Sequence, residues 1–175
     1  MGGRGLEIRT LSAQEARAHL DGLAAVLHDC VEGGASVGYL WPFTHEDARA
    51  VYAGYADEVE RGARLLLAAF LGGEVVGTVQ IVFAPHPNQP HRADIARMLV
   101  RRAARRRGIG QALLEEAERQ ARAAGKTVLV LDTVTGDDAE RLYERLGWER
   151  VGVVPDYALY PDGRLCSTTF FTKRL

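Results

Sequence analysis

Arg105-Arg106-Arg107-Gly108-Ile109-Gly110-Gln111-Ala112 marks the point where an apolar segment gives way to an amphipathic one. Residues 93–100 before it are predicted to form a strand, and residues 108–124 a helix that ends at Gly125. Free amides at a helix N-terminus, reinforced by the helix dipole, bind phosphate oxygens, and glycines let the backbone approach the anion. The pattern therefore predicts a phosphate site at this junction, flanked by the basic residues of 101–107.

Two other phosphate motifs fit the sequence less well. Gly125-Lys126-Thr127 resembles the end of a P-loop, but position 120 is Gln, and a strand is predicted to follow. Gly108-Ile109-Gly110 lacks the third glycine of a dinucleotide fingerprint. The basic run could also be a solvated turn or a nucleic-acid patch. The net charge of −1 and a pI of about 6.5 argue against a general nucleic-acid binder.

Predicted strands and helices alternate along the rest of the chain. Strands are expected at 6–10, 64–70, 75–83, 93–100, 127–133, 148–154 and 168–173, and helices at 12–29, 44–62, 108–124 and 138–146. Ser12 and Glu15 form a predicted capping box, and Gly72-Gly73 a predicted hairpin turn. This order predicts one α/β domain over residues 1–175, with a mixed central sheet of about seven strands flanked by about four helices.

Composition excludes several classes of protein. The two cysteines, Cys30 and Cys166, lie far apart, so neither a zinc cluster nor a disulfide framework is expected. The first residues contain no secretory apolar region, and no apolar run approaches the ~20 residues that span a bilayer. We therefore expect a cytoplasmic protein without a metal site.

Two blocks of sequence resemble the GNAT superfamily of N-acyltransferases. Arg105-x-x-Gly108-x-Gly110, after Met98-Leu99-Val100, is similar to the acyl-CoA signature of that superfamily, and residues 139–148 are similar to its second block. The resemblance covers nearly the whole chain. It implies a GNAT-like fold and an N-acetyltransferase that uses acetyl-CoA as its cosubstrate.

Three further segments carry a closer likeness. Residues 33–39, 131–133 and 160–165 resemble the tabtoxin-resistance acetyltransferases within that superfamily, which inactivate a β-lactam amino-acid toxin. The likeness implies a small-molecule amine as acceptor, including an amino-acid-like toxin or antibiotic, and hence a role in antibiotic resistance.

The resemblance also assigns the cofactor-binding residues. Backbone groups of Met98 and Val100 would pair with the pantetheine arm, which enters between strands 93–100 and 127–133. The amides of residues 106–111 would hold the pyrophosphate, with arginine side chains assisting. The full set is Met98, Leu99, Val100, Arg105, Arg106, Arg107, Gly108, Ile109, Gly110 and Gln111.

The chemistry requires a base for the amine and a proton or hydrogen-bond donor for the departing sulfur. Tyr143 occupies the general-acid position of the family, although its apolar neighbours also fit a core aromatic. Asp132 and Asp94 match the positions of carboxylates proposed as bases in the tabtoxin-resistance acetyltransferases. Asp132 ends an apolar run, where an unpaired buried acid would be costly. Gly136 stands where many GNAT enzymes have an asparagine that contacts the cofactor, and Asp137 could substitute for it.

Acidic and aromatic residues suit a cationic amine, although each could instead be a packing or surface residue. The acceptor-side candidates are Glu32, Ser36, Tyr39, Trp41, Asp156 and Tyr157, with Trp41 as the preferred lid residue. The long segment 33–43 favours a covered site over the open groove of a protein or peptide N-acetyltransferase. A non-catalytic nucleic-acid-binding or acyl-CoA-sensing module is the alternative of another class. We expect no nucleic-acid or membrane partner, and a monomer or homodimer.

Overall fold

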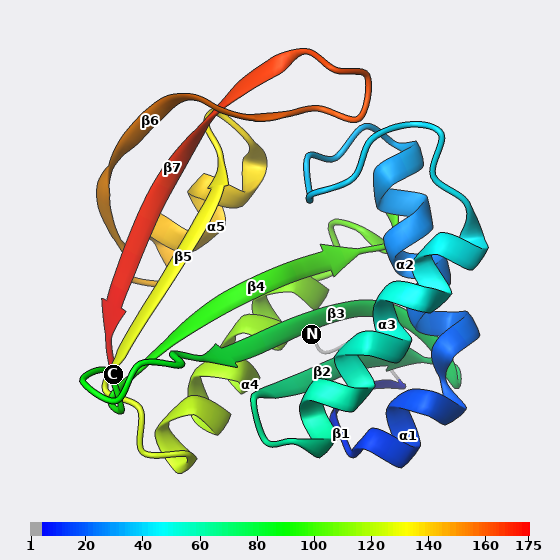
Figure 1. Ribbon diagram of the computed structural model, residues 1–175, viewed down its shortest axis with the longest axis horizontal. Coiled ribbons are helices and arrows are strands. Elements are labelled where there is room, and N and C mark those ends of the chain that lie inside the picture. Colours follow the sequence, from blue (N-terminus) through cyan, green and yellow to red (C-terminus); the bar gives the residue numbers. More distant parts are fainter. Residues whose placement is uncertain (1–4) are drawn as a thin grey trace.

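The computed structural model describes residues 5–175 and contains one seven-stranded sheet with five α-helices (Figure 1). In spatial order the strands are β1(Leu6–Leu11), β2(Arg64–Leu71), β3(Glu74–Phe83), β4(Arg92–Val100), β5(Val128–Val134), β7(Leu165–Arg174) and β6(Glu149–Leu159). The helices are α1(Ala13–Ala18), α2(Leu20–Glu32), α3(His45–Glu60), α4(Ile109–Ala123) and α5(Asp138–Arg145). Only β4 and β5 pair in parallel, and α4 connects them, so the predicted mixed α/β fold is confirmed.

The sheet separates two hydrophobic cores. Along β2, Leu67 and Ala69 face the core that contains α4, whereas Leu66 and Ala68 face the core formed with α1, α2 and α3. This alternation follows from the two-residue period of a strand whose two faces are both covered. Helices α1–α3 lie over the β1–β4 part of the sheet, and in the described chain no helix covers the same face of β5–β7 (Figure 1). Asp132 of β5, a candidate base, lies on this uncovered face.

The predicted helix over residues 12–29 is wrong in one respect, because it is two helices with a break at His19. The capping box of Ser12 and Glu15 begins α1 as expected, with hydrogen bonds of 2.8 and 3.1 Å. At His19 the backbone leaves helical geometry, and its imidazole packs edge-on against Phe70, 5.0 Å between ring centres. The second helix then continues to Glu32, beyond the expected end, and buries a continuous apolar face.

Strand β6 also extends beyond its predicted end at residue 154. Pro155 and Asp156 are typical of a turn, but here they lie in an irregularity between Val154 and Ala158, where Asp156 has a φ of 51°. A proline is tolerated at the edge of a sheet and at a bulge, so the strand resumes after it. The longer β6 carries residues 158 and 159 to the loop that follows α2.

Among residues 5–175, no helix combines the length and the apolar character needed to cross a membrane.

Candidate active site

The two parallel strands at the centre of the sheet lose their pairing part-way along, and we call this splayed region the β4–β5 slot. Strands β4 and β5 are in register only from Arg92 opposite Val128 to Asp94 opposite Val130. Beyond these residues they diverge, which Figure 1 shows as a V between green β4 and yellow β5. Residues 95–100 and 131–134 therefore do not pair with each other, so each strand has an edge with which an extended ligand could pair.

An irregularity in β4 shapes one wall of this slot. Thr78 is in register with Leu99, but Gln80 is in register with Ala96, so Arg97 and Met98 together oppose Val79. Such a bulge re-aims side chains and is common beside active sites. Leu99 is buried in the core with α1–α3, and the carbonyl oxygen of Val100 already accepts from Arg105 Nε at 3.1 Å.

The turn before α4 presents unpaired amides at the mouth of the slot. Within the described chain, no backbone amide of residues 106–111 donates to another protein group. Gly108, the N-cap of α4, has a φ of 75°, and a Cβ added to it would meet no atom within 4 Å. The helix dipole adds a partial positive charge to this concave set of donors. Free amides beside a partial positive charge are suited to phosphate oxygens, so the diphosphate site expected at this turn stays a prediction.

The arginine side chains of the loop differ in whether they are free to bind an anionic ligand. Arg102 is paired with Asp29 and Glu32, at 3.0 and 3.3 Å, so its charge is neutralised within the protein. Arg105 folds back on Val100 and lies 3.7 Å from the sulfur of Cys30. Arg101 and Arg107 border a hollow of about 260 Å³ next to the turn. These last two are therefore better placed than Arg102 to meet an anionic ligand.

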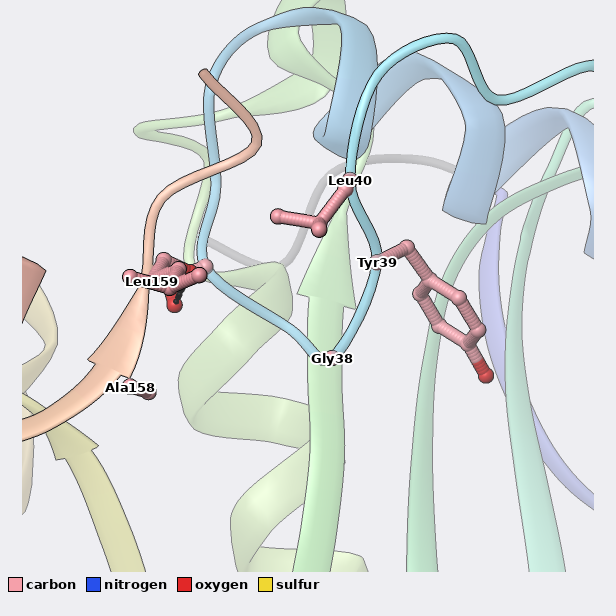
Figure 2. A pocket seen from close by; sticks show the side chains of 6 residues that line it. Gly38, Tyr39, Leu40, Ala158 and Leu159 are labelled. Carbon is pink, nitrogen blue, oxygen red and sulfur yellow. Dashed lines mark hydrogen bonds between the residues drawn. The ribbon is translucent and has the colours of Figure 1, made fainter. Parts of the chain in front are cut away.

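A second hollow, of about 220 Å³, lies between the loop after α2 and the end of β6 (Figure 2). Its lining residues are Ser36, Gly38, Tyr39, Leu40, Ala158 and Leu159. Leu40 and Leu159 face each other across it, whereas the Tyr39 ring points to the other side of the loop. Hydrogen bonds tie the loop to the β6–β7 hairpin. Ser36 Oγ donates to the carbonyl of Leu159 at 2.6 Å and accepts from Cys166 Sγ at 3.5 Å, and the Trp41 amide donates to the carbonyl of Pro161 at 2.9 Å.

The remaining acceptor-side candidates lie outside this hollow. Glu32 faces Arg102 beside the basic loop. The Trp41 indole donates to the carbonyl of Val31 at 2.9 Å, so this predicted lid residue is anchored at its ring as well as its backbone. Tyr157 packs edge-on against Phe170, and Asp156 occupies the β6 irregularity.

The two candidate bases lie on the sheet face that carries α1–α3, and over β5 no helix of the described chain covers that face. Asp94 is in register with Val130, and Asp132 follows two residues later on β5, so their side chains share a face. Asp94 accepts an ion-pair hydrogen bond from Arg92 at 2.6 Å. Asp132 accepts only from the hydroxyl of Thr168, at 3.2 Å, and no lysine or arginine of the described chain pairs with it. Of the two carboxylates, Asp132 therefore has the weaker hydrogen bond to the protein and no ion pair within the described residues.

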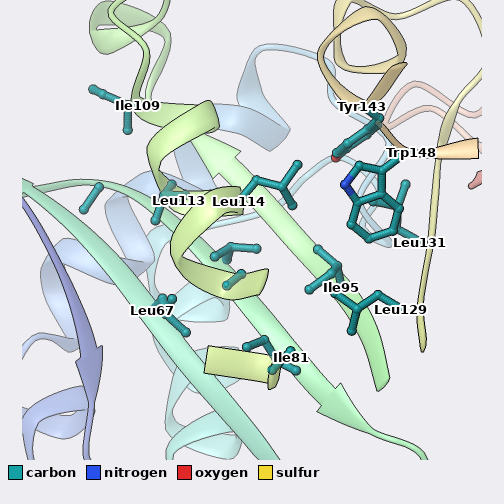
Figure 3. Close-up of a cluster of buried hydrophobic side chains, with 14 of the residues drawn as sticks. Leu67, Ile81, Ile95, Ile109, Leu113, Leu114, Leu129, Leu131, Tyr143 and Trp148 are labelled. Carbon is teal, nitrogen blue, oxygen red and sulfur yellow. The ribbon is translucent and has the colours of Figure 1, made fainter. Parts of the chain in front are cut away.

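Tyr143 lies on the opposite side of the sheet, beside Trp148 (Figure 3). The residue is 5 % exposed, and its ring centre lies 6.1 Å from that of Trp148 and 5.7 Å from that of Phe171. Its hydroxyl makes no hydrogen bond within the described residues. Burial, and then the negative charge of Asp132, raise the pKa of Tyr143 above its ordinary range. The hydroxyl is thus a neutral donor without an acceptor in the described chain, and the charge of Asp132 contributes to keeping it protonated.

The sequence profile of the Acetyltransferase (GNAT) family matches residues 23–148, which is most of the chain. The chain belongs to the GNAT family of acetyltransferases. The predicted enzyme class is confirmed by this match.

Solved structures with the same fold extend over nearly the whole GNAT chain. An N-acetyltransferase from Staphylococcus aureus Mu50 matches with a TM-score of 0.81 at 19% identity, covering 97% of this chain and 98% of that one. A ribosomal-protein-alanine N-acetyltransferase from Brucella melitensis matches at 27% identity with a TM-score of 0.79, covering 97% and 99%. A phosphinothricin acetyltransferase from Sinorhizobium meliloti, in complex with AcCoA, matches at 20% identity with a TM-score of 0.81, covering 97% and 88%.

The sequence reasoning missed two parts of this site. Leu40, Ala158 and Leu159 form the apolar lining of the hollow, but they come from distant segments, and no local pattern connects them. Arg97 was also missed, although an arginine inside an apolar strand is a signal in itself.

Proposed function

We propose that this GNAT enzyme transfers the acetyl group of acetyl-CoA to the primary amine of a small molecule by direct attack. The single observation that carries the proposal is the turn of unpaired amides at residues 106–111, at the mouth of the β4–β5 slot. The amides and Gly108 would hold the diphosphate, with Arg101 and Arg107 beside it, and the slot would take the pantetheine arm. Acetyl-CoA supplies an activated acyl group.

The two proton transfers of the reaction would take place on opposite faces of the sheet. Asp132 would accept the proton of the attacking amine, directly or through a water, because no cation of the described chain neutralises it. Tyr143 would donate a hydrogen bond to the departing sulfur from the other side, since its hydroxyl is protonated and unengaged. Asp94, which is held by Arg92, is the weaker candidate for the base.

The acceptor is proposed to be small because the loop after α2 is tied to the β6–β7 hairpin over one end of the site. The likeness of three segments to tabtoxin-resistance acetyltransferases, and the phosphinothricin acetyltransferase among the similar folds, motivate an amino-acid-like toxin or antibiotic. The likeness to a ribosomal-protein-alanine N-acetyltransferase favours a second candidate, the N-terminal amine of a protein.

Thiol release from acetyl-CoA, measured with a panel of small amines, amino-acid antibiotics and peptides that begin with alanine, separates the two candidates. Turnover of peptides alone would remove the small-molecule proposal. In the same assay Tyr143→Phe should reduce kcat about 10²-fold. Its affinity for acetyl-CoA, measured by calorimetry, should stay within about twofold of the parent because the amide turn is unchanged. Unchanged turnover would remove Tyr143 from the mechanism.

A further inference from the structure

Arg97 is a partly buried guanidinium that the protein does not neutralise. It lies in the β4 bulge with a φ of 51°, a backbone conformation that a residue with a side chain adopts only under constraint. The bulge sends its side chain to the same side of the sheet as α3 and the loop after α2. Its Cζ lies 5.9 Å from the ring centre of Tyr39, and its Nη2 would be 3.0 Å from a Cβ added to Gly38.

The surroundings of Arg97 supply no anion. Its Nε is fully buried without a hydrogen-bond acceptor, and no carboxylate of the described chain lies within 4.0 Å of its guanidinium. Burial opposes the charge of Arg97, but the hydroxyls of Tyr55 and Tyr39 outweigh burial and raise its pKa. Burial also raises the pKa of Tyr39 to about 12, so this tyrosine is uncharged at neutral pH and cannot balance the arginine.

Other arginines that are comparably placed do have partners. Arg64, with a side chain only 11% exposed, is paired with Glu58 and Gln80. Arg92, with a side chain 26% exposed, is paired with Asp94. A buried charge without a partner is costly, and such charges in proteins are ordinarily paired. The lack of an anionic partner for Arg97 therefore requires an explanation that the fold does not provide.

The position of Arg97 indicates which group could balance its charge. Its guanidinium lies beside Gly38, which also lines the hollow of about 220 Å³, and Arg97 is carried by β4, one of the two strands that border the slot. A guanidinium fork matches planar or tetrahedral oxyanions with two parallel hydrogen bonds. We propose that Arg97 binds an anionic group of the acceptor, so that the acceptor is an amine that also carries a carboxylate or a phosphorus oxyanion. This inference rests on the proposed function.

The test compares acceptors that share an amine and differ in charge. The twenty standard L-amino acids are assayed for thiol release from acetyl-CoA beside their primary amides and their aminophosphonate counterparts. The parent enzyme should favour the acid or the phosphonate over the neutral amide by about 10²-fold in kcat/KM, the size typical of losing one partner of a buried charge pair. The better of the two anionic arms identifies the oxyanion.

Arg97→Gln should reduce kcat/KM for the anionic acceptor by about 10²-fold, chiefly through KM, and leave the amide within about threefold. Arg97→Lys should recover part of the loss because it keeps the charge but not the fork. Arg119→Gln is the matched control, since Arg119 pairs with Glu116 on the outer surface of α4. Acetyl-CoA affinity, measured by calorimetry, should be the same for all of these proteins.

Equal turnover of acids and amides by the parent enzyme would overturn the inference, and so would an equal loss on both acceptors in Arg97→Gln. If Arg97→Gln does not fold, the comparison of acceptors in the parent enzyme decides the matter alone. Failure of the parent to bind acetyl-CoA would instead remove the proposed function and this inference with it.

Discussion

Asp132 and Asp94 show how two carboxylates on one sheet face can differ through their immediate partners. Arg92 donates to Asp94 at 2.6 Å, whereas Asp132 receives a single hydroxyl hydrogen bond from Thr168. The guanidinium of Arg92 occupies an oxygen of Asp94 that an amine or a water would otherwise contact, whereas no cation of the described chain pairs with Asp132. Asp132 is therefore the better placed base, and the outcome can be measured.

Asp132→Asn should lower kcat about 10²- to 10³-fold, because the amide cannot accept the amine proton. Asp94→Asn serves as the matched control, with a loss of no more than about tenfold expected. Steady-state kinetics on one acceptor at saturating acetyl-CoA would measure both. A larger loss in Asp94→Asn than in Asp132→Asn would reverse the assignment.

The pH dependence of turnover tests the state of Tyr143. Burial raises its pKa, and the charge of Asp132 adds to the shift, so the folded protein holds the phenol neutral even above its ordinary pKa of about 10. A raised pKa means that the donor proton is lost only at higher pH. We therefore expect no fall in kcat from Tyr143 between about pH 7 and about pH 9.5. An alkaline inflection in this range that disappears in Tyr143→Phe would contradict it.

The α4 N-terminus is the element on which cosubstrate binding should depend. Gly108 and Gly125 flank the helix at its two ends, with φ of 75° and 78°, and neither would place a Cβ within 4 Å of another atom. Alanine at either position should cost about 1 kcal/mol of folding free energy, because a left-handed conformation disfavours a side chain. Only Gly108→Ala should also weaken acetyl-CoA binding, by about tenfold, since its methyl group would project beside the amide turn.

Chemical denaturation and calorimetry on the two glycine variants measure these effects. The strain is matched at the two ends of the helix, so the difference in acetyl-CoA affinity between the variants isolates the ligand contact. Equal affinities in Gly108→Ala and Gly125→Ala would show that the turn is not the diphosphate site.

The elements that were predicted correctly are those whose signals are local. The capping box at Ser12, the helix start at Thr44, the Gly72-Gly73 turn and the glycine turn before α4 each depend on residues within one turn of chain. The break at His19 and the continuation of β6 past Pro155 depend on packing and on strand pairing across the sheet. No spacing of residues in the sequence predicts either feature, because both depend on tertiary contacts.

The same division holds for the site. Tyr143 and the amide turn follow from blocks of sequence, whereas the hollow joins the loop after α2 to β6 across a sequence separation of more than a hundred residues. Arg102 illustrates the difference within a single run of basic residues. Its identity predicted a cation for the ligand, but Asp29 and Glu32, which lie far away in sequence, neutralise it.

At the scale of the whole molecule, different contacts build the proposed acceptor end and the proposed cosubstrate end of the site. The loop after α2 is fastened to the β6–β7 hairpin through Ser36, which donates to the carbonyl of Leu159 at 2.6 Å, and the sulfur of Cys166 lies 3.5 Å from the same hydroxyl. The amide turn of α4 does not take part in these contacts. Removing the hydrogen bond of Ser36 should therefore weaken the binding of the acceptor and leave the binding of acetyl-CoA unchanged.

Ser36→Ala should lower the free energy of unfolding by about 1 kcal/mol, the net value of one hydrogen bond. Because the loop and Leu159 together enclose the hollow, it should also raise KM for the acceptor several-fold, with acetyl-CoA affinity unchanged. Ser167→Ala is the matched control, since within the described residues the hydroxyl of Ser167 makes no hydrogen bond. Denaturation, steady-state kinetics and calorimetry give the three readouts. A parallel loss of acetyl-CoA affinity in Ser36→Ala would show that the two ends act as one unit, and the separation of binding regions would have to be abandoned.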